Sequence, residues 1–425
     1  PNCAVLPIRI ADTFVVDGTR SAQSIAFAAD TGAVAASMAH GAMSDPYVVQ
    51  EMSRYAFENG LSLVGVAGDE NSFHAMYPAV HDNIVFAHSI RYDTGNSGDS
   101  VYSYSNTWNC NNFGMRMTVV APSPACATGS AANITGMVGL MHSAARDVGI
   151  ELHAGEVYQL LTGTADDIWL SEEEQQNSGA YPSSEGWDSF YGYGRVNAAL
   201  AVQAVGAGQI PPWVSIDSPR WFAPVYGESL VVEGTISATR TASFSYTIEV
   251  GTGADPEDWS LVTSGTGSGV LDGELATIAL DTLDLPDAIE SAYQTESLLE
   301  RYARIHEPAV TVLIRVEDAE GLTAELRKTV FVQEDDSLKA GFPLDMGASG
   351  EASPVLADMD GDSVLEIVIG TANGEILVID GSGAILDGWP VQVDQLGLHH
   401  EQAASWQASE GGLPDTITAS VAVAD

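Results

Sequence analysis

The chain contains 425 residues, of which 45% are hydrophobic, and this is enough to bury the cores of roughly two to four domains. Its 58 acidic residues far outnumber the 15 Lys and Arg residues, so the formal net charge is −43. Such a surface repels nucleic acids and anionic membranes, which makes both poor partners. The sequence has no run of about 18 apolar residues, so we expect no membrane-spanning helix.

The first part of the chain alternates short apolar runs with helical patterns. The runs predict strands at 5–10, 33–38, 61–67 and 84–89, and the patterns between them predict helices at 22–30 and 46–59. This alternation is typical of an α/β fold, in which a parallel sheet carries helices on both faces.

A turn containing Pro and Cys, at 121–126, leads into a run of small and apolar residues that predicts a buried helix. A tight loop of this kind can hold a hydroxyl at a helix N-terminus, where unpaired N–H groups and the helix dipole stabilise negative charge. Thr128 and Ser130 supply the hydroxyls. The alternative interpretation is a capped core helix that has no chemical role.

Other motifs accompany this segment in a fixed order. Leu61–Asn71 is an apolar strand that runs into a Gly-acidic turn, Tyr77-Pro-Ala79 follows it, and Tyr191–Ala198 lies downstream. Together the motifs resemble the C-terminal two-thirds of a subtilisin-like serine peptidase (a subtilase), over about residues 1–205. The resemblance implies a secreted serine-type endopeptidase that hydrolyses polypeptides.

The resemblance also assigns further elements. Residues 102–106 and 117–122 resemble late strands of the family's sheet, and 154–165 and 196–205 resemble its last two helices. The family's catalytic aspartate and histidine precede the strand that residues 5–10 resemble. We therefore expect both upstream of Pro1 and expect the chain to be a fragment that is inactive alone, because none of its histidines matches the family's motif.

The resemblance implies positions for the substrate and for the oxyanion donor. An extended polypeptide would lie along the residues that follow the 33–38 strand, namely Met38, Ala39, His40 and Gly41. The oxyanion-hole position falls on Asp69, where the family usually has asparagine. An ionised aspartate cannot donate a hydrogen bond, so this departure counts against catalysis.

The nucleophile position is also altered. The family's serine lies eight residues before a helix glycine, and counting back from Gly136 places Thr128 there. Ser130 is two positions nearer, and since two residues turn a helix by about 200°, its side chain would point away from the site. Threonine can attack a carbonyl, although its methyl group crowds the approach. Three possibilities for the nucleophile stay open: it is Thr128, it is Ser130, or the chain has no working nucleophile.

Two hypotheses follow from these residues. The first is a secreted endopeptidase, with activity in the full-length parent protein. The second is a catalytically degenerate subtilase-fold protein that binds or adheres through its C-terminal modules. The departures at Asp69 and Thr128 favour the second hypothesis, whereas the intact core motifs favour the fold and do not bear on catalysis.

The three cysteines are Cys3, Cys110 and Cys126. Cys110 and Cys126 flank the turn that leads to Thr128, and a disulfide between them would hold this loop. Three free thiols are the alternative.

The character of the chain changes after residue 205. Residues 206–212 form a linker rich in Pro and Gly. Residues 213–336 contain short β-branched runs separated by turn residues, which predicts a β-sandwich of the immunoglobulin or fibronectin type. The predicted strands lie at 230–236, 244–250, 276–280, 310–316 and 329–332.

The last segment, 340–425, has a third pattern. Ala352–Gly370 and Thr371–Asp380 resemble one blade of an FG-GAP/VCBS-type β-propeller. Ala419–Asp425 repeats the beginning of that blade, and a single blade cannot bury its own faces. We therefore expect further blades beyond residue 425 as partners of this one.

The blade contains an acidic loop with carboxylates at alternating positions, Asp358, Asp360, Asp362 and Glu366. Oxygen ligands spaced in this way around a glycine can converge on Ca²⁺, which takes six to eight oxygens. No Lys or Arg follows Lys339 to neutralise them. The loop therefore predicts a calcium site, with a solvated acidic turn as the alternative.

Overall fold

The computed structural model describes residues 3–11, 18–42, 44–90, 111–123, 125–171, 173, 181, 183–283, 285, 309–332, 337–350, 352–394 and 416–424. The chain forms two compact units. One consists of Pro1–Cys3, Gly32–Gly41 and Phe57–Glu334, and the other of Ala4–Thr31, Ala42–Ala56 and Asp335–Asp425. The first unit thus joins most of the predicted α/β region to the segment predicted as a β-sandwich.

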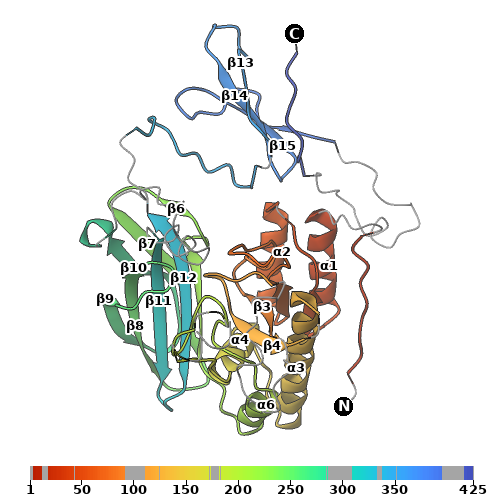
Figure 1. The fold of residues 1–425 in the computed structure, drawn as a ribbon, viewed down its shortest axis with the longest axis vertical. Helices are drawn as coiled ribbons and strands as arrows, with labels where there is room; N and C mark the ends of the chain where they lie inside the picture. The colour runs from red at the N-terminus through yellow and green to blue at the C-terminus, as the bar shows by residue number, and fades with distance from the viewer. Residues whose placement is uncertain are drawn as a thin grey trace. The chain divides into compact units, whose positions relative to one another are not determined.

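The first unit contains a parallel sheet with the order β1-β2-β3-β4 (Figure 1). Its strands are β1 (Ala35–Met38), β2 (Ser62–Val66), β3 (Ile84–Ile90) and β4 (Val119–Pro122). Every residue of β2 and β3 is buried, which is typical of the central strands of a parallel sheet. The predicted parallel α/β sheet is therefore confirmed.

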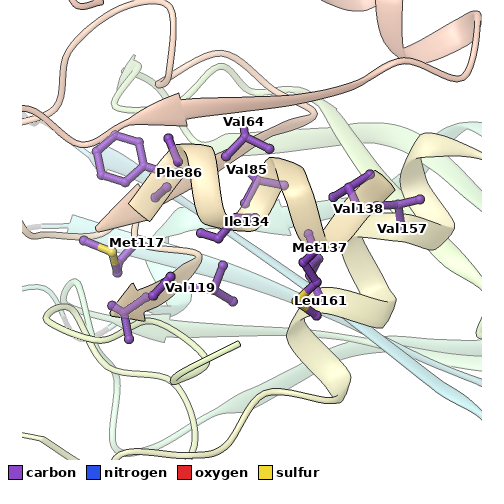
Figure 2. Close-up of a cluster of buried hydrophobic side chains, with 14 of the residues drawn as sticks. Val64, Val85, Phe86, Met117, Val119, Ile134, Met137, Val138, Val157 and Leu161 are labelled. Carbon is purple, nitrogen blue, oxygen red and sulfur yellow. The ribbon is translucent and has the colours of Figure 1, made fainter. Parts of the chain in front are cut away.

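Helix α3 (Ala127–Asp147) packs across this sheet and contacts all four strands. Figure 2 shows Ile134, Met137 and Val138 of the helix among side chains of the sheet such as Val64 and Val85. Burying one such aliphatic side chain contributes about 1.5–3 kcal/mol, so this contact is a main source of the unit's stability. The predicted buried helix is present, and α4 (Ala154–Gly163) and α6 (Ala198–Gly206) follow it.

The Tyr191–Ala198 motif continues the sheet beside β4. The N–H of Tyr193 donates to Thr118 O at 2.8 Å, and the N–H of Val196 donates to Val120 O at 3.0 Å. Gly192 has a φ of 60°, and a Cβ at this position would collide with the carbonyl of Thr118. Glycine is therefore required where the segment approaches the strand.

The prediction of a strand at 5–10 is wrong. Residues 3–11 form neither helix nor strand, and Val5 is 89% exposed. An apolar run becomes a strand only when a neighbouring strand supplies backbone hydrogen bonds, and this run pairs with none of the described strands. Residues 102–106, which resemble a late strand of the family, lie outside the described residues.

Two further sheets of the first unit share one hydrophobic core. Their strand orders are β10-β7-β5 and β6-β12-β11-β8-β9. The strands are β5 (Trp213–Ser218), β6 (Pro224–Val225), β7 (Ser229–Ala238), β8 (Phe244–Thr252), β9 (Ser260–Gly267), β10 (Gly269–Ala279), β11 (Ala309–Asp318) and β12 (Thr323–Val332). All five predicted strands are present, and β5, β6 and β9 were not predicted. The immunoglobulin or fibronectin type stays a prediction.

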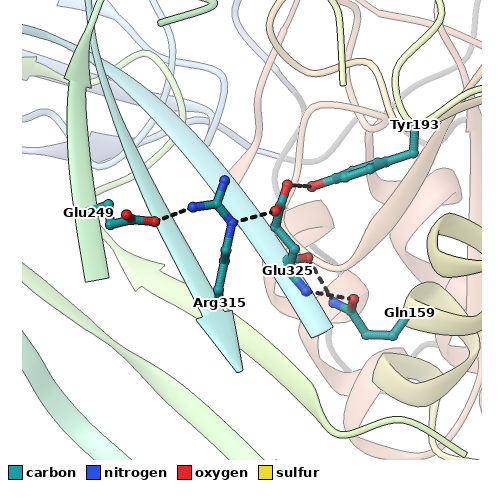
Figure 3. Close-up of polar contacts among 5 residues, drawn as sticks. All are labelled: Gln159, Tyr193, Glu249, Arg315 and Glu325. Carbon is teal, nitrogen blue, oxygen red and sulfur yellow. Dashed lines mark hydrogen bonds and ion pairs between the residues drawn. The ribbon is translucent and has the colours of Figure 1, made fainter. Parts of the chain in front are cut away.

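Strand β12 joins this two-sheet module to the α/β part of the unit. The side-chain amide of Gln159 on α4 pairs with the backbone of Glu325, with both hydrogen bonds at 3.0 Å (Figure 3). The Tyr193 hydroxyl donates to Glu325 Oε1 at 3.2 Å. Lys328, which is almost fully buried, lies 2.6 Å from Asp82 Oδ1 and also donates to Ile216 O. Removing Asp82 would leave the buried Lys328 charge without its ion pair, so the contact fixes how the two parts meet.

The second unit contains α1 (Gly18–Asp30), most of α2 (Tyr47–Glu58) and an antiparallel sheet. The Tyr55 hydroxyl of α2 donates to Asp30 Oδ1 at 2.7 Å, and the Tyr47 N–H donates to Asn373 Oδ1 at 2.8 Å. The sheet order is β13-β14-β15-β16, with β13 (Val355–Ala357), β14 (Glu366–Gly370), β15 (Glu375–Ile379) and β16 (Val391–Gln392).

Residues 416–424, which include most of the predicted second repeat, form no strand. Ile417 nevertheless donates its N–H to Thr371 O at 3.1 Å, beside the end of β14. A four-stranded antiparallel sheet is compatible with one propeller blade, and the propeller stays a prediction. Among the described helices, none has the length and apolar character needed to cross a membrane.

The centre of the parallel sheet buries a histidine. His88 on β3 is 1% exposed, and neither ring nitrogen makes a hydrogen bond within the described structure. Burial lowers the pKa of His88 from 6.5 to about 3. The folded protein therefore holds this imidazole neutral, whereas the unfolded chain protonates it below pH 6.5.

This difference predicts an acid-sensitive fold. Between about pH 6.5 and 3 the unfolded state binds one proton more than the folded state, so the free energy of unfolding falls by about 1.4 kcal/mol per pH unit of acidification. His88→Gln should reduce the slope of stability against pH in this window, whatever its effect at pH 7. Urea unfolding at several pH values measures the slope, and an unchanged slope would contradict the assignment.

Candidate functional site

The candidate site lies at the carboxyl edge of the parallel sheet. Because the four strands are parallel, the residues that follow β1, β2 and β4 meet at this edge. Asp69 follows β2, and α3 begins shortly after β4. The backbone N–H of Ala127, the first residue of α3, donates to Asp69 Oδ1 at 3.1 Å. The structure therefore brings the predicted oxyanion position and the predicted nucleophile segment together.

The Asp69 carboxylate acts as an acceptor at the N-terminus of α3. It is exposed and takes one of the N–H groups that have no partner inside the helix. A negative charge at this end of a helix contributes about 0.3–1 kcal/mol to stability. An oxyanion bound near this helix end would need hydrogen-bond donors. An ionised Asp69 is an acceptor, and its negative charge would repel the oxyanion.

Asn112 holds the turn that presents Asp69. Its Oδ1 accepts from the backbone N–H of Glu70 at 3.0 Å and of Ser72 at 3.3 Å, and its Nδ2 donates to the Glu70 carboxylate. Gly68 has a φ of 104°, and a Cβ there would collide with the Asn112 amide. This turn needs glycine for both its conformation and its close approach.

Thr128 and Ser130 occupy different environments. Thr128, on the first turn of α3, is half-buried, and neither its hydroxyl nor its N–H has a hydrogen-bond partner among the described residues. Ser130 is fully buried, and its hydroxyl donates to Ala127 O at 2.8 Å. Of the two hydroxyls, that of Thr128 is therefore the more accessible.

A general base is not found beside Thr128 in the described part of the chain. The unpartnered Thr128 hydroxyl excludes a bond to any described histidine. His40 is half-buried, and burial lowers its pKa. His142, further along α3, also has its pKa lowered, by burial and by Arg146. The site as described thus offers a hydroxyl, an orphan N–H and a carboxylate.

The predicted substrate-binding residues lie at the end of an edge strand. In the described structure β1 pairs only with β2, so its other side presents unpaired backbone groups. Met38 is buried, His40 is half-buried, and Ala39 and Gly41 are exposed. A Cβ on Gly41 would lie 2.8 Å from Met76 Sδ, the same atom that approaches Gly68. Met76 thereby connects this strand end to the Asp69 turn.

Cys126, the N-cap residue of α3, is disulfide-bonded, whereas Cys3 is an exposed free thiol. Cys110 lies outside the described residues, so the Cys110–Cys126 pairing stays a prediction. Ser123, in the same loop, accepts from the Ala125 N–H at 3.1 Å and packs against Gly129. The loop before Thr128 is therefore held by the Ser123 contacts at one end and by the Cys126 disulfide at the other.

The two cysteine environments predict different reactivity. In the folded, oxidised protein Cys3 should be alkylated at once, whereas Cys126 and Cys110 should react only after reduction. A disulfide that closes a loop of this length contributes about 3 kcal/mol in the chain-entropy model, so reduction should also lower the melting temperature. Mass spectrometry of alkylated peptides measures this, and alkylation of Cys126 without reductant would contradict the bridge.

The predicted calcium loop connects β13 to β14 in the second unit. One ligand oxygen from each of Asp358, Asp360 and Glu366 lies within 4.8 Å of the others. Glu366 is buried, and its Oε2 accepts from the Met359 N–H at 2.7 Å. Asp362 is not part of this group, and its Oδ1 accepts from the Val364 N–H at 2.7 Å. Three of the four predicted ligands are therefore brought together.

Sequence reasoning missed the residues that support the edge. Asn112 contacts the Asp69 turn from a distant position in the chain, and Met76 lies against Gly68 of this turn from a nearby one. The adjacent asparagines at 111 and 112 are a turn signal, but such a signal does not indicate which other loop they will contact.

Comparisons with known proteins give distant likenesses. No protein-family model matches the chain. The solved structure of the prenylagaramide maturation protease PagA is similar with a TM-score of 0.37 and 14% identity, over 47% of this chain and 72% of that chain. A lanthipeptide protease gives 0.36 and 13%, over 46% and 68%, and the patellamide maturation protease PatA gives 0.34 and 17%, over 45% and 70%. Similarities this low carry no inference about activity, which has to come from the chain's own geometry.

Proposed function

We propose that this chain carries the nucleophile side of a subtilisin-like serine-type endopeptidase site, with Thr128 at the nucleophile position. The observation that supports it most is the half-buried, unpartnered Thr128 hydroxyl on the first turn of α3, at the carboxyl edge of a parallel sheet. The predicted oxyanion position, Asp69, contacts the same helix end. Ser130 is assigned no chemical role because it is buried and bonded within the helix.

In the proposed reaction, Thr128 Oγ1 attacks the carbonyl carbon of a polypeptide substrate and gives its proton to a base. The orphan N–H of Thr128 is oriented by the helix to stabilise the resulting oxyanion. The substrate lies extended along the side of β1 that faces away from β2, near Met38–Gly41. The base is not among the described residues, and in this proposal it precedes Pro1 together with its aspartate.

The proposal places the protein outside the cell and assigns its other modules. The disulfide of Cys126 supports an oxidising compartment. Two sheets around one core support an immunoglobulin- or fibronectin-like sandwich at 213–336, and an antiparallel four-stranded sheet supports one FG-GAP/VCBS-type blade. Further blades would then be the partners of this blade.

A second candidate function is binding or adhesion by a catalytically degenerate subtilase fold. The hydrogen bond from Ala127 to Asp69 favours it, because an ionised carboxylate sits where a donor would act. Losing one oxyanion donor costs about 100- to 1,000-fold in rate. The sandwich and the propeller blade would carry the binding role.

A fluorophosphonate probe tests the nucleophile. In the natural gene product, including whatever precedes Pro1, the probe should label the peptide that contains residues 127–135. Thr128→Ala should abolish labelling, and Ser130→Ala should retain most of it, because only Thr128 is accessible. Tandem mass spectrometry identifies the labelled residue.

Asp69→Asn provides the matched comparison. It conserves the shape of the side chain and replaces an acceptor by a donor, so an active peptidase should be labelled on the order of 100 times faster. Labelling of Ser130 would contradict the assignment of Thr128 to the nucleophile position. No labelling of either the natural protein or Asp69→Asn would exclude the peptidase and leave the binding function.

Calcium at the acidic loop is part of the proposal. Asp358, Asp360 and Glu366 present convergent oxygens, and the hard, flexible oxygen donor set suits Ca²⁺ better than Mg²⁺. The two exposed carboxylates and the buried one lie close enough to repel, and a divalent cation removes that repulsion. Asp362 lies outside this group.

Calcium should therefore raise the melting temperature of the blade relative to chelator. Asp360→Ala should remove most of this difference, because it deletes one of the three convergent ligands. Asp362→Ala is the control and should preserve it. If calorimetric titration detects no calcium binding, the loop is a solvated acidic turn and the calcium proposal is wrong.

A further inference from the structure

A large groove within the first unit separates the α/β part from the outer face of the five-stranded sheet. It has a volume of about 1260 Å³. One wall is formed by β8, β9, β11 and β12, and the other by α4 and the segments at 184–187 and 193. The contacts drawn in Figure 3, from Arg315 through Glu325 to Tyr193 and Gln159, lie along this groove.

Two tryptophans and an arginine form the most distinctive part of the lining. The guanidinium carbon of Arg327 lies 3.7 Å from the centre of the Trp187 ring and 5.5 Å from that of Trp259. Trp187 is 6% exposed and is fixed by its Nε1–H, which donates to Met117 O at 2.8 Å. Trp259 is half-buried, so part of its ring is available to a ligand.

Arg327 has an unused donor in this lining. It is 7% exposed, and its Nε–H has no hydrogen-bond partner within the described structure. Its ion pair with Asp255 is long, with 3.4 Å between an Nη of Arg327 and Asp255 Oδ1. A buried donor without a partner is costly, and an acceptor from a ligand in the groove would satisfy it.

The charge of the groove restricts the ligand. Five carboxylates line it, Glu185, Asp255, Glu257, Glu317 and Glu325, against the guanidinium groups of Arg315 and Arg327. Arg315 is already paired with Glu249 and Glu325. An anionic ligand would be repelled, and an apolar one would leave the carboxylates and the exposed hydroxyls of the sheet desolvated.

A polyol meets all of these demands. Its hydroxyls donate to carboxylates and accept from Arg327 Nε–H, and the C–H face of a sugar ring packs on an exposed tryptophan face. The volume exceeds the roughly 300–1,000 Å³ of ordinary small-molecule sites, so several sugar units fit. We propose that the Trp187–Arg327–Trp259 groove binds a neutral oligosaccharide.

This site is distinct from the candidate catalytic edge. Trp187 and Tyr193 bond to Met117 and Thr118, at the amino end of β4, whereas Thr128 follows its carboxyl end. The proposal goes beyond the peptidase function, and its test requires no catalysis. Failure of either proposal therefore leaves the other unchanged.

Isothermal titration calorimetry tests the groove on the full chain. The probes are neutral hexasaccharides of glucose, xylose, mannose, galactose and N-acetylglucosamine, with hexalysine as the charged comparison. We expect at least one hexasaccharide to bind, with an affinity that changes less than twofold between 50 mM and 500 mM NaCl, as for a neutral ligand. Trp259→Ala should weaken binding at least tenfold.

Matched variants separate binding from folding. Trp169 is an exposed tryptophan outside the groove, and Trp169→Ala should change the affinity less than twofold. Glu257→Gln removes an exposed carboxylate of the groove and should weaken binding severalfold without disturbing the core. Absence of hexasaccharide binding would overturn the proposal, as would binding that Trp259→Ala and Glu257→Gln both leave unchanged. Salt-sensitive binding of hexalysine alone would instead identify a groove for basic peptides.

Discussion

Helix α3 has to lie flat on four buried strands, and this packing constrains the rest of the first unit. A helix that contacts every strand of the sheet needs small residues where it approaches closely and apolar ones between them. Its first turn is thereby fixed at the carboxyl edge, next to the turn after β2. The position of Thr128 is thus a consequence of how the core packs.

Strand β12 has a comparable role for the two-sheet module. Arg327 and Lys328 are neighbours in the chain and point to opposite faces of the strand, and both are buried. Lys328 reaches Asp82 in the α/β part, whereas Arg327 stacks on Trp187 of the same part. Two buried cations on one strand are expensive unless both find partners, so the pairing specifies a single arrangement of the two parts.

The features that could be predicted from the sequence are those that depend on local patterns of residues. Buried runs such as Ser62–Val66 and Ile84–Ile90 were located correctly because continuous apolar strands between helices have few alternatives. The run at 5–10 failed because strand formation depends on a neighbour, which composition does not reveal. The contact from Asp69 to Ala127 and the support from Asn112 join distant positions, and the groove requires two modules to meet. Neither has a signature in the sequence.

In the proposed peptidase, the Asp69 carboxylate has opposite effects on stability and on catalysis. As an acceptor for the Ala127 N–H it stabilises the helix end by about 0.3–1 kcal/mol. A missing oxyanion donor costs about 2.7–4 kcal/mol of transition-state stabilisation, which is several times larger. When Asp69 is ionised, it therefore stabilises the helix end but does not stabilise an oxyanion. Because an ionised Asp69 side chain donates no hydrogen bond, turnover in the proposed peptidase would depend on backbone N–H groups at this edge, such as that of Thr128.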